Sequence, residues 1–293
     1  MYTLKFENEN GNIITLSGVE KTYQIISIEG LNPPNATIHR SEVAGMDGSK
    51  YMSAQLGERN IVLTVKINGE VEKNRLNLYK YFKTKHWCKM YYSNESREIY
   101  IEGYVEAIEC GLFTSSEQMQ ISIICPDPYF YSLTEIVTDI SKGFGNFEFP
   151  FAFGAKGAVE DTITDEAIEF SYYVKDRIVS LYNEGEDETG FIVEIVANDI
   201  VVNPTIFNVD TREFFTVKIS LEKNDVLTIN TNKGQKSISL LHGLVTTNAI
   251  NHVARNSTWL NLSKGENQFT YQAESGDADM LIRFIHRNKY QAV

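Results

Sequence analysis

The stretch Cys125-Pro126-Asp127-Pro128-Tyr129-Phe130-Tyr131 divides the chain into two unlike parts. Pro126 and Pro128 fix their own φ angles and supply no N–H donor, so the strand predicted at 119–125 has to end there. The aromatic residues that follow need a surface against which to be buried. We therefore interpret Asp127, Pro128, Tyr129 and Phe130 as a hinge between two domains and not as an active site.

Length and composition predict two folded domains. The chain has 293 residues, of which 42% are hydrophobic and 12% aromatic, enough for two separate cores. We expect a first domain at 1–130, a Gly/Phe-rich linker or arm at 131–160 and a second domain at 161–293. The first residues show neither a basic nor an apolar leader, and no run of about 18 apolar residues occurs. We therefore expect synthesis in a cytoplasm, without secretion or membrane insertion.

The net charge of −12 is unevenly distributed. Residues 1–130 hold 13 basic and 16 acidic side chains, whereas residues 131–293 hold 14 and 23. Proteins that bind a duplex normally present a basic face that releases counterions, and no such face is visible here. Sequence-specific binding of nucleic acid is therefore not expected.

No pattern in the sequence predicts catalysis, a cofactor or a metal ion. Nucleophile-elbow, zinc-protease, dinucleotide and P-loop motifs are missing, and the five histidines are scattered. The three cysteines have no close spacing, so we expect buried free thiols. The acidic run 184–188 lacks the spacing of a calcium loop, and we expect a solvated hairpin tip there. Trp259 is either a sugar-stacking platform or a core residue, and its neighbours Leu260 and Leu262 favour the core.

Hydrophobic periodicity predicts a mainly β first domain with one helix. Residues 61–67 and 99–107 alternate with period two, as half-buried strands do. Residues 40–50 show little periodicity and two glycines, so we expect a long loop there. Between Glu70 and Lys85, Val71, Leu78 and Phe82 share one stripe, which predicts a helix.

The second domain is predicted to be an antiparallel β-sandwich of the jelly-roll kind. The segment 143–154 alternates Phe with Gly and Pro, which indicates an extended linker. About eight short strands with turn residues between them follow, and such a pattern is typical of a sandwich. The predicted strands are 168–174, 191–195, 215–221, 226–230, 237–241, 259–262, 268–273 and 280–285.

This order of segments resembles the distal tail protein family of long-tailed phages, which also occurs in related tail-like particles such as tail-like bacteriocins. The resemblance rests on four pieces: Asp127–Phe130, then Gly45-Met46-Asp47-Gly48 followed by Arg59-Asn60-Ile61, and two stretches of the second domain at 203–231 and 259–267. The family often has Gly where Asn224 stands, and Asn also tolerates the positive φ of a turn.

The resemblance implies an architectural protein of the virion, assembled in the host cytoplasm. Six copies would form a ring through their first domains and join the tail tube to a hub or tail-associated protein. The galectin-like second domains would point outward and hold receptor-binding or fibre proteins. Subunit contacts would then come from Gly45, Met46, Asp47, Gly48 and the rest of loop 40–58, from Arg59, from Asp127–Phe130, from the outer face of the helix and from the aromatic linker. A sugar-binding module is the alternative, with Trp259 as its platform.

Overall fold

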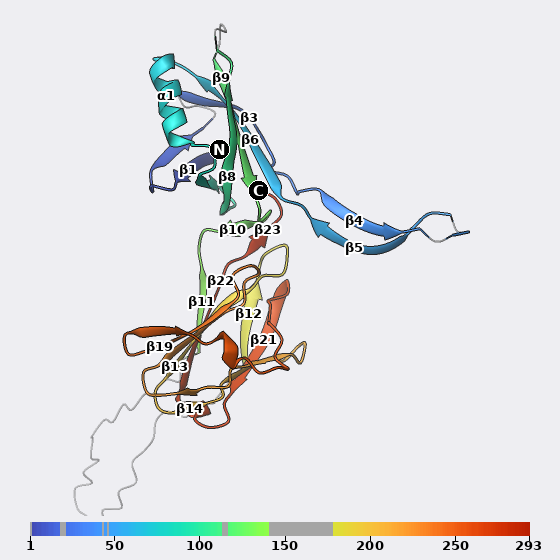
Figure 1. Ribbon diagram of the computed structural model, residues 1–293, viewed down its shortest axis with the longest axis vertical. Helices are drawn as coiled ribbons and strands as arrows, with labels where there is room; N and C mark the ends of the chain where they lie inside the picture. The colour runs from blue at the N-terminus through green and yellow to red at the C-terminus, as the bar shows by residue number, and fades with distance from the viewer. Residues whose placement is uncertain (1, 18–21, 43, 46, 113–116, 141–177) are drawn as a thin grey trace, which may run out of the picture.

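The computed structural model describes residues 2–17, 22–42, 44–45, 47–112, 117–140 and 178–293. These residues form two β-rich bodies, one above the other along the long axis of the molecule (Figure 1). The first body contains the N-terminal strands and the helix, and the second contains most strands after residue 135. The mainly β fold with one helix is confirmed for the described residues.

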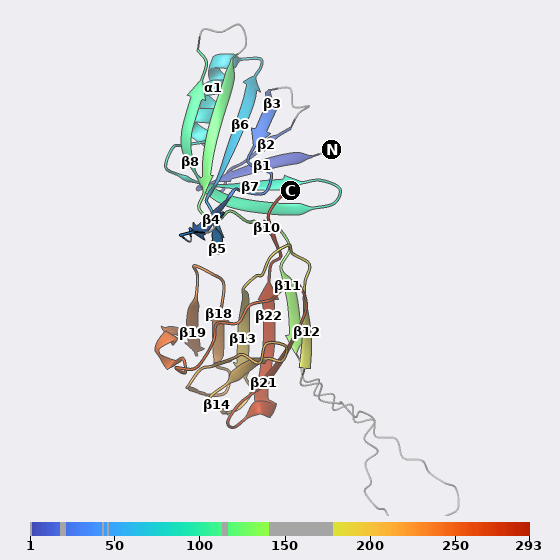
Figure 2. The ribbon, with the colours of Figure 1, turned by 90° about the vertical axis from the view of Figure 1, so that its right-hand side faces the viewer.

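The first body is one antiparallel sheet with a helix packed against it (Figure 2). Its main path runs β2-β1-β7-β8-β9-β6-β3. The strands are β1 (Thr3–Asn8), β2 (Ile13–Leu16), β3 (Tyr23–Glu29), β6 (Arg59–Ile67), β7 (Trp87–Ser93), β8 (Glu98–Cys110) and β9 (Gln118–Cys125). Period-two alternation predicted β6 and β8, since their inward residues are buried while the outward ones contact water.

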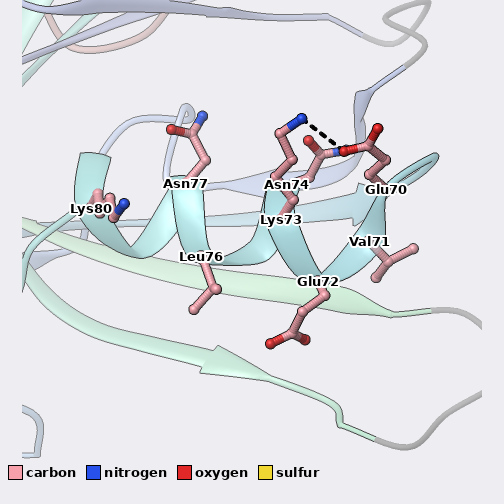
Figure 3. A pocket seen from close by; sticks show the side chains of 8 residues that line it. All are labelled: Glu70, Val71, Glu72, Lys73, Asn74, Leu76, Asn77 and Lys80. Atoms are coloured by element: carbon pink, nitrogen blue, oxygen red, sulfur yellow. Dashed lines mark ion pairs between the residues drawn. The ribbon is translucent and has the colours of Figure 1, made fainter.

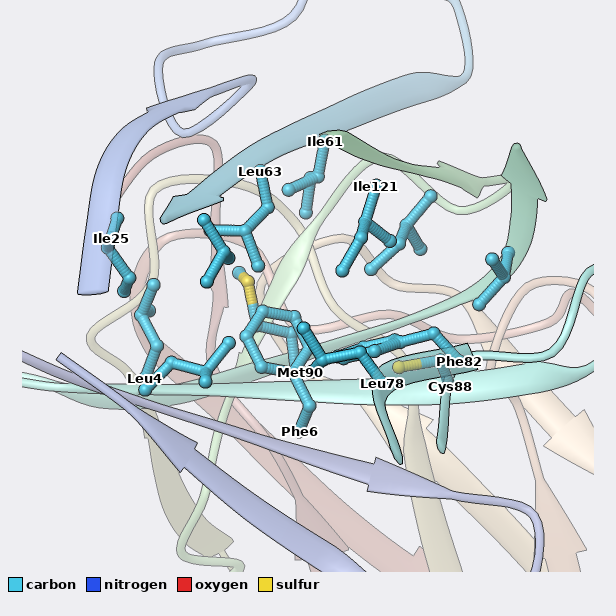
Figure 4. Close-up of a cluster of buried hydrophobic side chains, with 14 of the residues drawn as sticks. Leu4, Phe6, Ile25, Ile61, Leu63, Leu78, Phe82, Cys88, Met90 and Ile121 are labelled. Carbon is cyan, nitrogen blue, oxygen red and sulfur yellow. The ribbon is translucent and has the colours of Figure 1, made fainter. Parts of the chain in front are cut away.

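Helix α1 (Val71–Tyr81) closes the core of the first body. Leu78 and Phe82 are buried, and the ring of Phe82 meets that of Phe6 edge-on, with centroids 5.4 Å apart (Figure 4). The helix ends before the predicted Lys85 because Phe82 leaves the helical region, while its N–H still bonds to the carbonyl of Leu78. Burial raises the pKa of Cys88 and of Cys125 to about 12, as expected for unreactive core thiols.

The strands of a two-stranded arm take up Arg40, Ser41 and Lys50 at the two ends of the loop predicted at 40–50. β4 (Ala36–Ser41) and β5 (Lys50–Leu56) pair with each other and project from the first body (Figure 1). Nearly every residue of both strands is exposed. A strand with both faces in water has no apolar alternation, and this is why the loop prediction was wrong at the strand ends.

The second body is a sandwich of two antiparallel sheets. The larger has the order β11-β22-β13-β18-β19-β20, and the smaller β12-β21-β15-β16. Phe191 and Phe284 from the larger sheet meet Phe269 from the smaller, with ring centroids 5.4–5.7 Å apart. The strands are β11 (Ile136–Ile140), β12 (Ile178–Asn183), β13 (Phe191–Ala197), β15 (Thr205–Asn208), β16 (Phe214–Thr216), β18 (Val226–Asn230), β19 (Ser237–His242), β20 (Val245–Asn248), β21 (Gly265–Gln272) and β22 (Met280–His286), beside the short pair β14 (Val201–Val202) and β17 (Ser220–Leu221).

Several predicted strands of the second body need correction. Residues 259–262 form a loop and not the predicted strand. Leu260 and Leu262 are nevertheless buried, because this loop packs against the core. The segment 215–221 is divided between β16 and β17. The predicted strand 168–174 and the Gly/Phe run 143–154 lie outside the described residues. The first residues of the predicted linker form strands, and the division 1–130, 131–160 and 161–293 stays a prediction.

The chain crosses between the two bodies twice. β10 (Phe130–Ser132) follows the proline run and pairs with β8 of the first body. β23 (Lys289–Tyr290), which follows β22, returns from the second body and pairs with β10. The end of the chain therefore extends the sheet in which the chain begins (Figure 1).

Candidate functional site: the clasp and the arm

The proline run forms a fixed turn directly after β9. The Asp127 carboxylate accepts hydrogen bonds from the Tyr129 N–H at 3.2 Å and from the Tyr131 hydroxyl at 2.6 Å. Burial, reinforced by the bond to Asp127, raises the pKa of Tyr131. The turn therefore aims Phe130 into the first core, where it is fully buried.

Arg59 lies at the centre of this junction. It is the first residue of β6 and pairs in register with Cys125, the last residue of β9. Its side chain, only 2% exposed, donates to four main-chain carbonyls, and its guanidinium carbon lies 4.6 Å from the ring centroid of Phe130. The acceptors are Pro128 at 2.7 Å, Gly30, Asn32 at 2.6 Å and Gln291 at 2.7 Å. We call Arg59 and these four carbonyl groups the clasp.

Two acidic side chains of the second body accept hydrogen bonds from residues at the junction between the two bodies. Glu186 accepts from the N–H of Gln291 and from Arg97, each at 2.9 Å. Asp187 accepts from the Tyr129 hydroxyl at 2.7 Å. Glu184, Glu186 and Glu188 of the acidic run 184–188 are exposed, as predicted. The run is not a hairpin tip, because it joins strands of two different sheets, and two of its carboxylates have partners near the first body. No local pattern in the sequence indicates these contacts, since most of the partners lie about a hundred positions away.

Stacked aromatic rings and cation–π contacts also lie at the junction between the bodies. Tyr100 of β8 stacks on Tyr131 of β10 with centroids 5.9 Å apart, and Arg287 lies 5.4 Å from the centroid of Tyr100. The Lys289 ammonium lies 5.3 Å from the centroid of Tyr129, and burial lowers the pKa of Lys289. Such contacts stabilise a partly desolvated cation. The two bodies are therefore held by many directional contacts.

The arm carries the first group of predicted contact residues. Gly45, Asp47 and Gly48 lie between β4 and β5 at its tip, whereas Met46 lies outside the described residues. Large apolar side chains on the two strands are exposed to water: Ile38 by 54%, Tyr51 by 62% and Met52 by 60%. The structure therefore separates Gly45, Asp47 and Gly48 from Arg59, whereas it brings Asp127–Phe130 next to Arg59.

A pocket lies along helix α1 (Figure 3). Its lining comes from this helix and from the residue that precedes it: Glu70, Val71, Glu72, Lys73, Asn74, Leu76, Asn77 and Lys80. Lys73 and Glu70 form an ion pair of 2.8 Å in which both side chains are largely exposed. An open hollow of this kind fits a contact surface better than an enclosed small-molecule site.

Trp259 is the candidate for sugar stacking. The half-buried ring of Trp259 lies 4.7 Å from that of Phe215, and the Lys236 ammonium lies 5.2 Å from its centroid. Those contacts favour packing over sugar stacking. Among the described residues, no group of three or more His, Cys, Asp or Glu is placed to hold a metal ion. In the same part of the chain, no helix has the length and apolar character needed to cross a membrane.

Comparisons with known proteins bear on both bodies. Residues 18–125 match the family model of the phage tail protein RIFT-related domain, and residues 184–290 match that of the siphovirus-type tail component, C-terminal domain. No curated protein matches the sequence.

Among solved structures, the chain resembles the Dit protein (gp 19.1) of phage SPP1, with 12% identity, 99% of both chains covered and a TM-score of 0.68. It also resembles chains in two structures of the phage P2 baseplate in its activated conformation. The sequence identity is 14% for the structure with Ca and 13% for the structure with Sr. Both P2 matches cover 100% of each chain with a TM-score of 0.52. These likenesses show a shared fold.

The order of the matched segments, on either side of a proline junction, defines a structural component of a phage tail. The chain belongs to the phage distal tail protein family of siphovirus-type tails. It is therefore a tail or baseplate protein of a virion.

Proposed function

We propose that six copies of this chain form a ring through their first bodies, between the tail tube and the tail hub. The second bodies point outward and hold receptor-binding or fibre proteins. The protein acts by burying surface and not by catalysis. The Dit protein of SPP1 is described as a paradigm of the hub adsorption apparatus in phages that infect Gram-positive bacteria, which supports this proposal for a member of the same family.

The arm is the observation that carries the proposal. A two-stranded hairpin without other contacts is marginally stable in water, and this one exposes Ile38, Tyr51 and Met52. Exposed apolar side chains gathered on a projecting element are typical of a protein interface. We infer that each arm packs on the neighbouring copy, a head-to-tail contact that closes into a ring. A stable ring contact buries about 2,000 Å² or more.

The charge distribution agrees with a ring through which DNA passes. With 13 basic and 16 acidic side chains, residues 1–130 repel one another little when six copies meet. The strongly acidic part from 131 onward lies at the periphery, where copies are farther apart than a Debye length of about 8–10 Å. A channel wall without a basic face would not retain DNA.

Substitutions in the arm test the proposal. Tyr51→Asp combined with Met52→Asp places two charges in the inferred contact, and we expect it to reduce the assembled mass in light scattering to that of the monomer. Leu244→Asp is the matched control, because Leu244 is 100% exposed on the hairpin between β19 and β20 of the second body. Assembly by the arm variant at the level of the control would contradict the inferred contact.

A further inference from the structure

The segment 288–293 contributes to the core and sheet of the first body, although it follows the second body in the chain. Tyr290 pairs with Phe130 on β10. Tyr290 and Val293 pack against the core of the first body, and the Val293 N–H bonds to the carbonyl of Leu31 at 3.4 Å. The first body is therefore built from two separated parts of the sequence.

Two arginines of the first body depend on this segment. Arg59 donates from Nη2 to the carbonyl of Gln291, which is 232 positions away. Arg97 donates from Nη1 to the carbonyl of Ala292 at 3.0 Å, and its guanidinium carbon lies 4.6 Å from the ring centroid of Tyr290. A buried guanidinium that loses an acceptor keeps its desolvation cost, so the loss of this segment destabilises the clasp.

The second body positions this segment. β23 follows β22, which pairs with both β11 and β13 in the larger sheet. Glu186, on the connection between β12 and β13, accepts from the N–H of Gln291. The segment thus reaches the clasp as a pre-ordered strand once the sandwich has formed, which lowers the entropic cost of docking it.

We propose that segment 288–293 makes assembly of the first body conditional on the folding of the second. The first body reaches its ring-forming state after the second sandwich has delivered β23 to β10 and Gln291 to Arg59. A chain whose second body has not folded is thereby kept out of the ring. The assembly part of this inference rests on the proposed ring, whereas its folding part does not. It also implies that a fragment 1–135 lacks a piece of its own fold.

The two tryptophans allow a direct test, because Trp87 lies on β7 of the first body and Trp259 in the second. Trp259→Phe and Trp87→Phe each leave one fluorescent reporter. Residues 290–293 are deleted from both single-tryptophan chains. We expect the thermal midpoint reported by Trp87 to fall by about 5–10 °C, with a smaller change at Trp259 and loss of rings in light scattering.

Gln291→Ala is the matched control, since it keeps the carbonyl that Arg59 binds and removes one long side-chain contact to Asp187. If the deletion abolishes the thermal transitions of both reporters, a shorter deletion of residues 292–293 is compared in the same way. This deletion must again lower the midpoint at Trp87 more than the midpoint at Trp259. The inference would be overturned if the deleted chain had the same Trp87 midpoint as the Gln291→Ala control, or if it formed rings at the same yield as that control. If the parent chain forms no ring, either alone or with its tube protein, the ring proposal fails, and the Trp87 midpoint still decides the folding part.

Discussion

Arg59 illustrates how one residue fixes the junction. Its charge is buried without a carboxylate among its hydrogen-bond partners, and four carbonyl dipoles from three segments surround it instead. Burial lowers the pKa of Arg59, but an arginine stays protonated at every physiological pH. The clasp is therefore insensitive to pH by itself.

Replacing Arg59 with Met is expected to cost about 3–5 kcal/mol, because four main-chain carbonyls lose their charged donor. The free energy of unfolding in urea measures this. Arg283→Met is the control, since Arg283 pairs with Asp139 on the exposed surface, where an ion pair contributes little. Equal losses in the two variants would contradict the role assigned to Arg59.

Gly30 supplies one of the clasp carbonyls and has a φ of +85°. A Cβ at this position would lie 2.1 Å from the carbonyl oxygen of Asn60, so Gly30→Ala must displace the main chain. Gly11 has a similar φ of +74° but open space around it. We expect Gly30→Ala to be more destabilising than Gly11→Ala by about 2 kcal/mol or more in thermal unfolding. Equal losses of stability in the two variants would show that the main chain moves away from the new Cβ at little cost.

His286 gives the fold a dependence on pH. Burial lowers its pKa below 6.5, although the bond to the Tyr182 carbonyl at 3.2 Å opposes this effect. Between the lowered pKa and 6.5, the unfolded chain binds more protons than the folded one, so stability falls as pH falls through that window. Unfolding free energies measured from pH 7.5 to 5 should show this slope, and His286→Gln should flatten it; an unchanged slope would exclude His286 as its source.

At the scale of elements, alternation predicted the strands that have one buried face. β6, β8, β13 and β22 all keep such a face, and the stripe of Leu78 and Phe82 predicted α1. The arm escaped prediction because both of its faces contact water. β23 escaped because two residues carry no period, and its pairing depends on β10 far earlier in the chain.

The predicted contact residues were found from the sequence, whereas their long-range partners were not. The resemblance pointed to Arg59 and Asp127–Phe130, and the structure brings them together at the clasp. Gln291, which binds Arg59, and Asp187, which binds Tyr129, could not be found from spacing, because only the fold brings these distant positions together. Which of the predicted residues contact a second copy stays a prediction.

The arm also has an expected dynamic signature. Because β4 and β5 bond to each other and project from the body, their amides should exchange quickly with solvent in the monomer. Packing on a neighbouring copy should slow this exchange, and hydrogen exchange with mass spectrometry can compare the two states. Unchanged exchange in the arm after assembly would place the subunit contact elsewhere.

At the scale of the whole molecule, the two crossings make the bodies act as a unit. A single linker would leave their relative orientation free, whereas β10, β23 and the acidic residues Glu186 and Asp187 tie them together. A ring of first bodies would then hold its second bodies at a fixed angle. That geometry suits a platform on which outer proteins are mounted.

The proposed function depends above all on the ring, and negative-stain electron microscopy of the purified chain can show the ring itself. We expect particles with six-fold symmetry, single or stacked back to back, with the second bodies at the rim. A chain that remains monomeric at high concentration, alone and with its tube protein, would rule out the ring.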